Sequence, residues 1–384
     1  MPYERILRDQ ERFRRKIGVK EVDRPTYERY ISGPIDRFDR RKNAFLLITP
    51  DNPYGADIRE RWLHRTGQTD REPLPYRELN PEDRFGQSLT NAAWRLCREY
   101  HPQTAPVTPS EGKFELPKDS MSRLIKKAAL FFGAHYVRIA ELDRRWVYKD
   151  VDIPHKYAIM CVVPHAPSLN QSAPSHFSSA AVAETYSKLK YITTQLADFI
   201  CGLGYEASYR ETLGSAPEML VVPVAIDAGV GEFARNGRVL SPEFGINMRI
   251  KPVTTDIPLA VDKPISFGVH DFCMDCENCA LYCPVQAIPY GPPTEKPVDI
   301  YNNPGYRKWY INAEKCLTFW SVDKKKWTTC GGRCMAVCPW NKPGNIGHNT
   351  VRWLAVHSPS FVRRGLIHAD RILYRRRNKL RREM

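Results

Sequence analysis

The cysteines of this chain are concentrated in one short region. Of the 11 cysteines in 384 residues, eight lie between residues 273 and 338. They are Cys273, Cys276, Cys279, Cys283, Cys316, Cys330, Cys334 and Cys338. The first four have the spacing C-x2-C-x2-C-x3-C followed by a proline, which is typical of bacterial proteins with two iron–sulfur clusters. In such runs three close cysteines bind one cubane and the fourth reaches the other.

Eight thiolates are enough for two [4Fe–4S] clusters with none left over. We expect a first cysteine set of Cys273, Cys276, Cys279 and Cys338, and a second cysteine set of Cys283, Cys316, Cys330 and Cys334. The last run is irregular, because the gap between Cys330 and Cys334 is one residue longer than usual. Structural zinc prefers paired CxxC knuckles, and disulfides suit small secreted chains. The pattern therefore favours clusters over both alternatives.

Composition is that of a globular chain with room for two or three domains. Hydrophobic residues make up 42% of it, and no apolar run has the length of a membrane span. Arg14 and Arg15 are followed by charged residues, where a twin-arginine export signal needs an apolar stretch. We therefore expect no transmembrane segment and a cytoplasmic protein as the sequence is written. If a leader has been removed, the mature form is exported or membrane-associated.

The C-terminal end is strongly basic. The whole chain has a formal net charge of +15, and residues 363–384 hold nine Arg or Lys against Asp370 and Glu383. A docking surface for an anionic partner is one interpretation. The interpretation that we favour is a solvated helical end. No aromatic residues alternate with these charges as they do in a nucleic-acid groove, so nucleic acid is not an expected partner.

Patterns before the cysteine region divide the chain further. Residues 1–117 are rich in charge, Pro and Gly and predict a loop-rich extension with a few helices. One of these helices is expected over residues 88–100, with Leu89, Ala92, Ala93 and Leu96 on one face. Cys97 lies in this segment and is interpreted as a core thiol.

Residues 118–262 alternate between helical and strand patterns, which predicts an α+β or layered α/β domain. A first helix is expected to be capped by Ser120 or Ser122 and to end at Gly133. A long helix is expected over residues 178–202. Strands are expected over residues 136–140, 157–163 and 248–253. Residues 263–345 then form a ferredoxin-like module, and residues 346–384 form the basic tail.

Several phrases resemble the corrinoid-dependent reductive dehalogenases. The phrases are Phe132-Gly133-Ala134, Leu203-Gly204-Tyr205, Ala225-Ile226-Asp227-Ala228-Gly229, Thr255-Asp256-Ile257-Pro258-Leu259, Cys316-Leu317-Thr318-Phe319-Trp320 and Cys338-Pro339-Trp340. The resemblance covers nearly the whole chain. It implies an α+β fold, in which a nitroreductase-like core holds a base-off cobalamin beside a ferredoxin-like module with two [4Fe–4S] clusters. It also implies removal of halide from an organohalide with two electrons and one proton. The electrons would come from an external donor such as a ferredoxin, a flavodoxin or a quinol-linked reductase.

The resemblance also implies roles for individual residues. By position, Tyr186 matches the proton donor of the family and Arg249 its basic assistant. A guanidinium beside a phenol stabilises the phenolate and eases proton release. Without the resemblance, Tyr186 would be a core residue and Arg249 a surface charge at a strand edge. Gly229, Gly231 and Asn236 are expected corrinoid contacts, with a plain turn role as the alternative.

Two other functions stay open. Epoxyqueuosine reductase also combines cobalamin with two cubanes and acts on tRNA, and a basic chain would suit it. Against it stand the Phe319-Trp320 phrase, the Tyr186 and Arg249 pair in place of an aspartate donor, and the long N-terminal part. A non-catalytic iron–sulfur electron carrier is the third function, and corrinoid content would separate it from both enzymes.

Overall fold

The computed structural model describes residues 3–66, 80–99, 109–209, 218–322, 332–342 and 344–383. The longer described helices are α1 Tyr3–Lys16, α3 Ala56–Thr66, α4 Pro81–Glu99, α5 Lys118–Phe131, α7 His176–Gly202, α9 Val269–Cys276, α11 Ala313–Val322, α13 Ile346–His357 and α14 Ser360–Glu383. The short helices are α2 Ala44–Leu47, α6 Pro167–Asn170, α8 Val221–Asp227, α10 Asn278–Leu281 and α12 Arg333–Ala336. The main strands are β2 Tyr136–Glu141, β3 Tyr157–Pro164, β4 Ala207–Ser208 and β7 Met248–Thr255.

A four-stranded antiparallel sheet forms the centre of the fold. Its order is β2-β3-β7-β4, and β3 pairs with β7 over its whole length and with β2 from Tyr157 to Val162. The strand predictions over residues 136–140, 157–163 and 248–253 are confirmed. Residues 157–163 are all buried, which explains their uninterrupted apolar run, because both faces of the central strand are covered.

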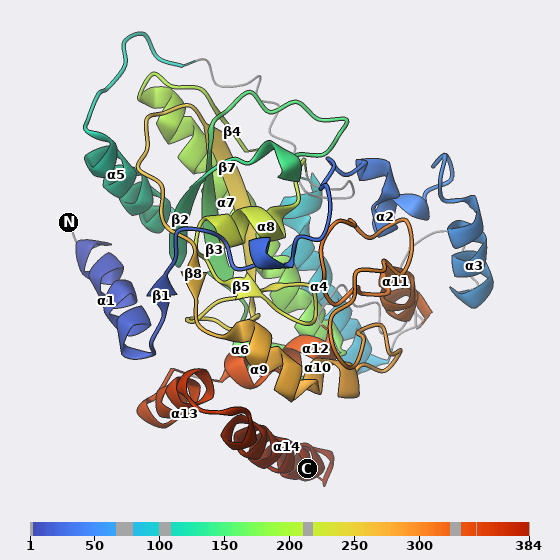
Figure 1. The fold of residues 1–384 in the computed structure, drawn as a ribbon. Coiled ribbons are helices and arrows are strands. Elements are labelled where there is room, and N and C mark those ends of the chain that lie inside the picture. The colour runs from blue at the N-terminus through green and yellow to red at the C-terminus, as the bar shows by residue number, and fades with distance from the viewer. Residues whose placement is uncertain are drawn as a thin grey trace.

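Helices cover both faces of this sheet (Figure 1). Alternate residues of β3 point to opposite faces. Ile159 and Cys161 face α5 and α7, whereas Met160 and Val162 face α8 and the segment around Trp146. The long helix predicted over residues 178–202 is confirmed, and Cys161 is fully buried in the core. The mixed architecture confirms the predicted α+β class.

Two details of the predicted helices are wrong. α5 begins at Lys118 after Pro117, so neither Ser120 nor Ser122 caps it. The Ser122 hydroxyl instead donates to the carbonyl of Ala260 (3.0 Å) and accepts from its amide (2.8 Å). Ser122 therefore binds the backbone of a distant residue, Ala260, instead of the start of its own helix. Gly133 ends this helix as predicted, with φ +107°.

α4 exposes the face that the sequence suggested was buried. Leu89 and Leu96 are 38% and 40% exposed, whereas Trp94 is 5% exposed and packs against α7. The helix thus turns its small and aromatic residues inward, because α4 and α7 approach closely. The side chain of Cys97 lies outside the described residues.

The N-terminal extension is attached to the cysteine-rich module. Strand β1 Lys20–Glu21 pairs with β8 Ile265–Ser266, and Ile31 bridges to Tyr306. The predicted domain limits at residues 117, 262 and 345 stay predictions. Asn345 caps α13, and α13 and α14 lie against α9 at one end of the molecule (Figure 1). None of the helices in the described ranges has both the length and the apolar character of a membrane span.

Candidate functional site

The first cysteine set converges where α9 meets α10. Cys273 and Cys276 lie on α9 and are buried. Glu277 follows in the left-handed conformation (φ +50°), so the chain turns sharply and α10 brings Cys279 back toward them. A small cavity is lined by all four cysteines of the set. The structure therefore brings together the four ligands predicted for one cluster.

The thiols of the first set are buried, so a thiolate at these positions needs a positive charge beside it. Burial raises the pKa of Cys276 to about 12 and that of Cys273 to about 11. The pKa of Cys279 lies well above its usual range, first because of burial and then because four other cysteines surround it. An iron–sulfur cluster supplies the positive charge that keeps such sulfurs deprotonated. The residues of the first set thus fit a cluster.

The second cysteine set comes from three elements. Cys316 lies on α11, Cys334 on α12, and Cys283 follows α10 and accepts a hydrogen bond from the amide of Ala287 at 3.2 Å. α10 packs against α12, which places Cys334 near Cys279 of the first set. Cys330 lies outside the described residues, so the ligands of the second cluster stay a prediction.

Tyr186 and Arg249, the predicted proton donor and its assistant, are in contact. Arg249 on β7 places its guanidinium carbon 5.3 Å from the centre of the Tyr186 ring on α7. The ring of Trp94 stacks beside Tyr186, with centroids 5.4 Å apart and planes 24° apart. Arg249 is 6% exposed, so the expectation of a surface charge is wrong. Contact with the tyrosine ring offsets part of the cost of burying this cation.

Arg249 keeps part of its hydrogen-bonding capacity unused. Nη1 donates to the carbonyl of Met248 at 3.2 Å, whereas Nε and Nη2 have no hydrogen-bond partner within the described part of the chain. His165 is buried nearby, and burial together with the charge of Arg249 holds its pKa well below the usual range. His165 is therefore neutral at pH 7, and its Nε2 also has no partner among the described residues. Buried polar atoms of this kind indicate a missing polar ligand.

Asn236, a predicted corrinoid contact, has an unpartnered side chain in the part of the chain that the structure describes, and its contact with a corrinoid stays a prediction. It lies in the turn between β5 Glu232–Phe233 and β6 Val239–Leu240, and it lines the same cavity as the first cysteine set. Both polar atoms of its amide are buried and, in the described ranges, unpartnered. The corrin rim carries amide groups that donate and accept hydrogen bonds, so Asn236, Arg249 and His165 fit this group.

Gly229 and Gly231 have structural reasons to be glycine. A Cβ atom on Gly229 would lie 2.1 Å from the carbonyl oxygen of Lys263, and φ is +73°. A Cβ atom on Gly231 would lie 2.1 Å from the carbonyl oxygen of Leu240. Close backbone packing therefore accounts for both residues, and their contact with a corrinoid stays a prediction.

Sequence reasoning missed two residues of this region. Trp94 was not singled out, because the apolar spacing of its helix indicated another face. Arg235 precedes Asn236 and is 1% exposed, and it donates to the carbonyl of Cys273. An arginine next to a predicted ligand in an apolar hairpin was the signal that could have identified it.

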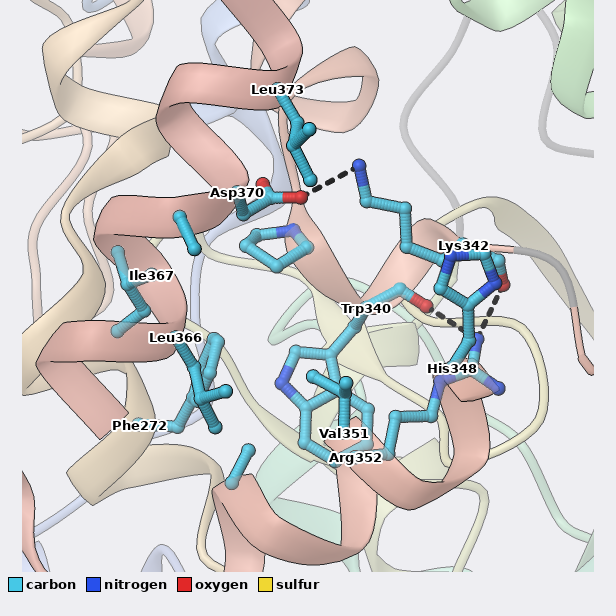
Figure 2. A pocket seen from close by; sticks show the side chains of 13 residues that line it. Phe272, Trp340, Lys342, His348, Val351, Arg352, Leu366, Ile367, Asp370 and Leu373 are labelled. Atoms are coloured by element: carbon cyan, nitrogen blue, oxygen red, sulfur yellow. Dashed lines mark hydrogen bonds and ion pairs between the residues drawn. The ribbon is translucent and has the colours of Figure 1, made fainter. Parts of the chain in front are cut away.

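A larger cavity lies outside this site. It has a volume of about 280 Å³. Apolar side chains of α9, α13 and α14 line it around Trp340, together with the polar side chains of Lys342, His348, Arg352 and Asp370 (Figure 2). Trp340 is 2% exposed and packs edge-on against Phe267 and Phe272. No cysteine lines this cavity in the described part of the chain. It borders the module rather than the Tyr186 and Arg249 pair.

Two kinds of known enzyme are similar to this chain in sequence. Tetrachloroethene reductive dehalogenase of Desulfitobacterium hafniense is 32% identical over 291 residues, which cover 62% of this chain and 51% of that protein. The chain thus spans about half the length of the curated relatives it matches. Epoxyqueuosine reductase of Escherichia coli K12 is 25% identical over 190 residues, covering 46% of this chain and 44% of that protein.

A solved structure and a family model agree with the first relative. A reductive dehalogenase whose structure suggests a mechanism for B12-dependent dehalogenation superposes with a TM-score of 0.70 at 23% identity. The superposition covers 93% of this chain and 49% of that one. Residues 272–342 match the 4Fe-4S dicluster domain. The chain therefore has the fold of this reductive dehalogenase, and the family model places a 4Fe-4S dicluster domain in the predicted cysteine-rich module.

Proposed function

We propose that this chain is a reductive dehalogenase that removes halide from an organohalide with two electrons and one proton. Two [4Fe–4S] clusters, held by the first and second cysteine sets, would deliver the electrons. A cobalamin bound near Asn236, His165 and Arg249 would supply cobalt-centred reduction of the carbon–halogen bond. The relatives named above, the dicluster match and the buried unpartnered polar atoms support this proposal.

The contact between Tyr186 and Arg249 is the observation that carries the proposal. A phenol is a weak acid near pH 7, so it transfers a proton readily only when the charge left on its oxygen is stabilised. The buried cation of Arg249 is close enough to do this. Trp94 stacks beside the phenol and limits its rotation. Tyr186 would thus hold the proton at its Oη atom and deliver it.

The first experiment tests the cofactors. The full chain is reconstituted anaerobically with iron, sulfide and cobalamin, and its metal and corrinoid contents are then measured. We expect about eight irons and about one cobalt per chain. A chain with both clusters but without corrinoid would support the electron-carrier alternative and contradict the proposal.

The second experiment tests the proton donor. Tyr186→Phe is expected to reduce halide release at least a hundredfold, which is of the order of a general acid's contribution. Iron and cobalt contents should stay at the wild-type level. Tyr191→Phe is the matched control, because Tyr191 lies on the same helix and is 51% exposed. Unchanged halide release in Tyr186→Phe would exclude this residue as the donor.

The substrate assay separates the two enzymes. Halide release from chlorinated ethenes and halogenated phenols is compared with conversion of epoxyqueuosine in a tRNA stem loop. We expect activity on organohalides alone. The external electron donor is proposed to be a ferredoxin, a flavodoxin or a quinol-linked reductase, each of which is added as the reductant in turn.

A further inference from the structure

Three cysteines of the first set each lie near a different arginine. Arg235 follows β5, Arg352 lies on α13, and Arg371 lies on α14. Their electrostatic partners in the set are Cys273, Cys338 and Cys276, respectively. Arg371 thus lies in the basic end, residues 363–384, that the sequence suggested was solvated, and Arg352 lies on the helix just before it.

Arg235 is the most buried of the three, at 1% exposure. Its Nε and Nη2 donate to the carbonyl of Cys273 at 3.1 and 3.0 Å. Nη1 donates to the carbonyls of Pro289 and Gly291, and the guanidinium lies 4.6 Å from the ring centre of Trp309. The nearest acid is Glu277 at 3.4 Å, whose side chain is 31% exposed and therefore offsets the charge only in part.

Arg371 attaches α14 to the segment that carries the cysteines. Nη2 donates to the carbonyl of Cys276, and Nε donates to the side-chain oxygen of Asn278 at 2.6 Å. Asp370 also lies near Cys276, but it forms an ion pair with Lys342 at 2.8 Å. The positive charge of Arg371 at this ligand is therefore not cancelled by its acidic neighbour.

Arg352 holds the chain just after Cys338. Nη2 donates to the carbonyl of Trp340 at 2.9 Å and to that of Lys342, as Figure 2 shows. Burial lowers the pKa of Arg352, and the nearby sulfur of Cys338 opposes this effect. The side chain is 5% exposed, so little water screens its charge.

We propose that Arg235, Arg352 and Arg371 raise the reduction potential of the cluster bound by the first cysteine set. This inference rests on the clusters of the proposed function. A cubane with four thiolate ligands changes its net charge from about −2 to about −3 when it takes up one electron from an external donor. Buried positive charges beside the ligands favour the more negative, reduced state. The arginines are positioning residues, because they act through the cluster's ligands.

The test is an anaerobic redox titration of the full reconstituted chain, followed by electron paramagnetic resonance. Arg352→Gln and Arg371→Gln are each expected to weaken electron binding by roughly three- to tenfold, where tenfold equals 59 mV for one electron. The midpoint of one cluster signal should become more negative, and that of the other should not move. Arg40→Gln removes the same charge at an ion pair with Asp150, whose partners are 32% and 34% exposed, and should leave both midpoints unchanged.

A charge-preserving variant separates charge from geometry. Arg371→Lys keeps the positive charge but loses the planar hydrogen-bonding fork. A midpoint close to wild type in this variant supports the inference, even if Arg371→Gln loses iron. Wild-type midpoints in iron-replete Arg352→Gln and Arg371→Gln, or an equal negative shift in Arg371→Lys, would overturn it. A wild-type chain that binds no iron would instead overturn the proposed function itself.

Discussion

Buried ionisable residues show how single side chains depend on their surroundings. Asp227 lies at the end of α8, where it accepts hydrogen bonds from the Tyr27 hydroxyl at 2.5 Å and from the Trp146 indole at 3.1 Å. Burial is the largest influence and raises its pKa to about 7, although both donors oppose the shift. The sequence showed this aspartate only as part of a turn. Its protonation depends on the two aromatic neighbours that the fold brings together.

The stability of the chain should therefore depend on pH through Asp227. The folded carboxyl has a higher pKa than the unfolded one, so folding is favoured at low pH and weakened as the pH rises from about 4 to about 7. We expect Asp227→Asn to remove this dependence and to be more stable than wild type at pH 8, by a few kcal/mol at most. Melting temperatures of wild type and Asp227→Asn, measured from pH 5 to 8, test this expectation. Asp150→Asn, a change at the surface, is the control. Parallel curves for wild type and Asp227→Asn would contradict the expectation.

Arg249 allows a second prediction at this scale. Arg249→Gln removes the cation beside Tyr186 but keeps a polar side chain. Halide release should fall roughly ten- to hundredfold, because the charge left on the phenol oxygen is no longer stabilised. Arg249→Lys should retain more activity than Arg249→Gln, although a lysine stacks less well on a ring. Equal activity of wild type and Arg249→Gln in the halide assay would remove Arg249 from the proposed chemistry.

Two helices show which structural features local sequence patterns do not predict. The periodic pattern located α5 and α7 well, because each buries one apolar stripe against the same sheet. It failed at the start of α5 and at the buried face of α4. In both places a contact with a distant segment decided the outcome. Ser122 pairs with Ala260, and Trp94 packs against α7.

The two serines of α5 provide a direct test. Ser122→Ala leaves the amide and carbonyl of Ala260 without their side-chain partner, so the free energy of unfolding should fall by about 1–3 kcal/mol. Ser120→Ala should change it by less than about 0.5 kcal/mol, since Ser120 is exposed. Urea unfolding of both variants measures the difference. A larger loss in Ser120→Ala would restore the capping interpretation.

At the scale of the whole molecule, the N-terminal helix is joined to the core by a buried ion pair. Arg14 on α1 lies 2.5 Å from Glu243, and it also donates to the carbonyls of Gly229 and Val230. The two side chains are only 7% and 8% exposed. Removing one partner of such a pair leaves an uncompensated buried charge, whereas removing both does not.

This contact predicts a strong coupling between the two residues. Arg14→Met is expected to lower the free energy of unfolding by about 3–5 kcal/mol. The double variant Arg14→Met with Glu243→Gln should recover part of that loss. Arg5→Met with Asp9→Asn is the control, because this pair on the same helix is exposed. Additive effects in a double-mutant cycle would show that the pair does not hold α1 to the core.

The sequence alone was sufficient for features that follow from local chemistry. Cysteine spacing predicted the dicluster domain, and sequence patterns predicted the long helix and the strand over residues 157–163. The family resemblance selected Tyr186 and Arg249 as a pair. Tertiary structure decided the features that require two distant segments. It buried Arg249 against Tyr186, turned α4 onto its other face and placed arginines of the basic tail beside the first cysteine set. Spacing along a chain fixes which atoms lie within one turn, but only packing fixes which charges share a buried site.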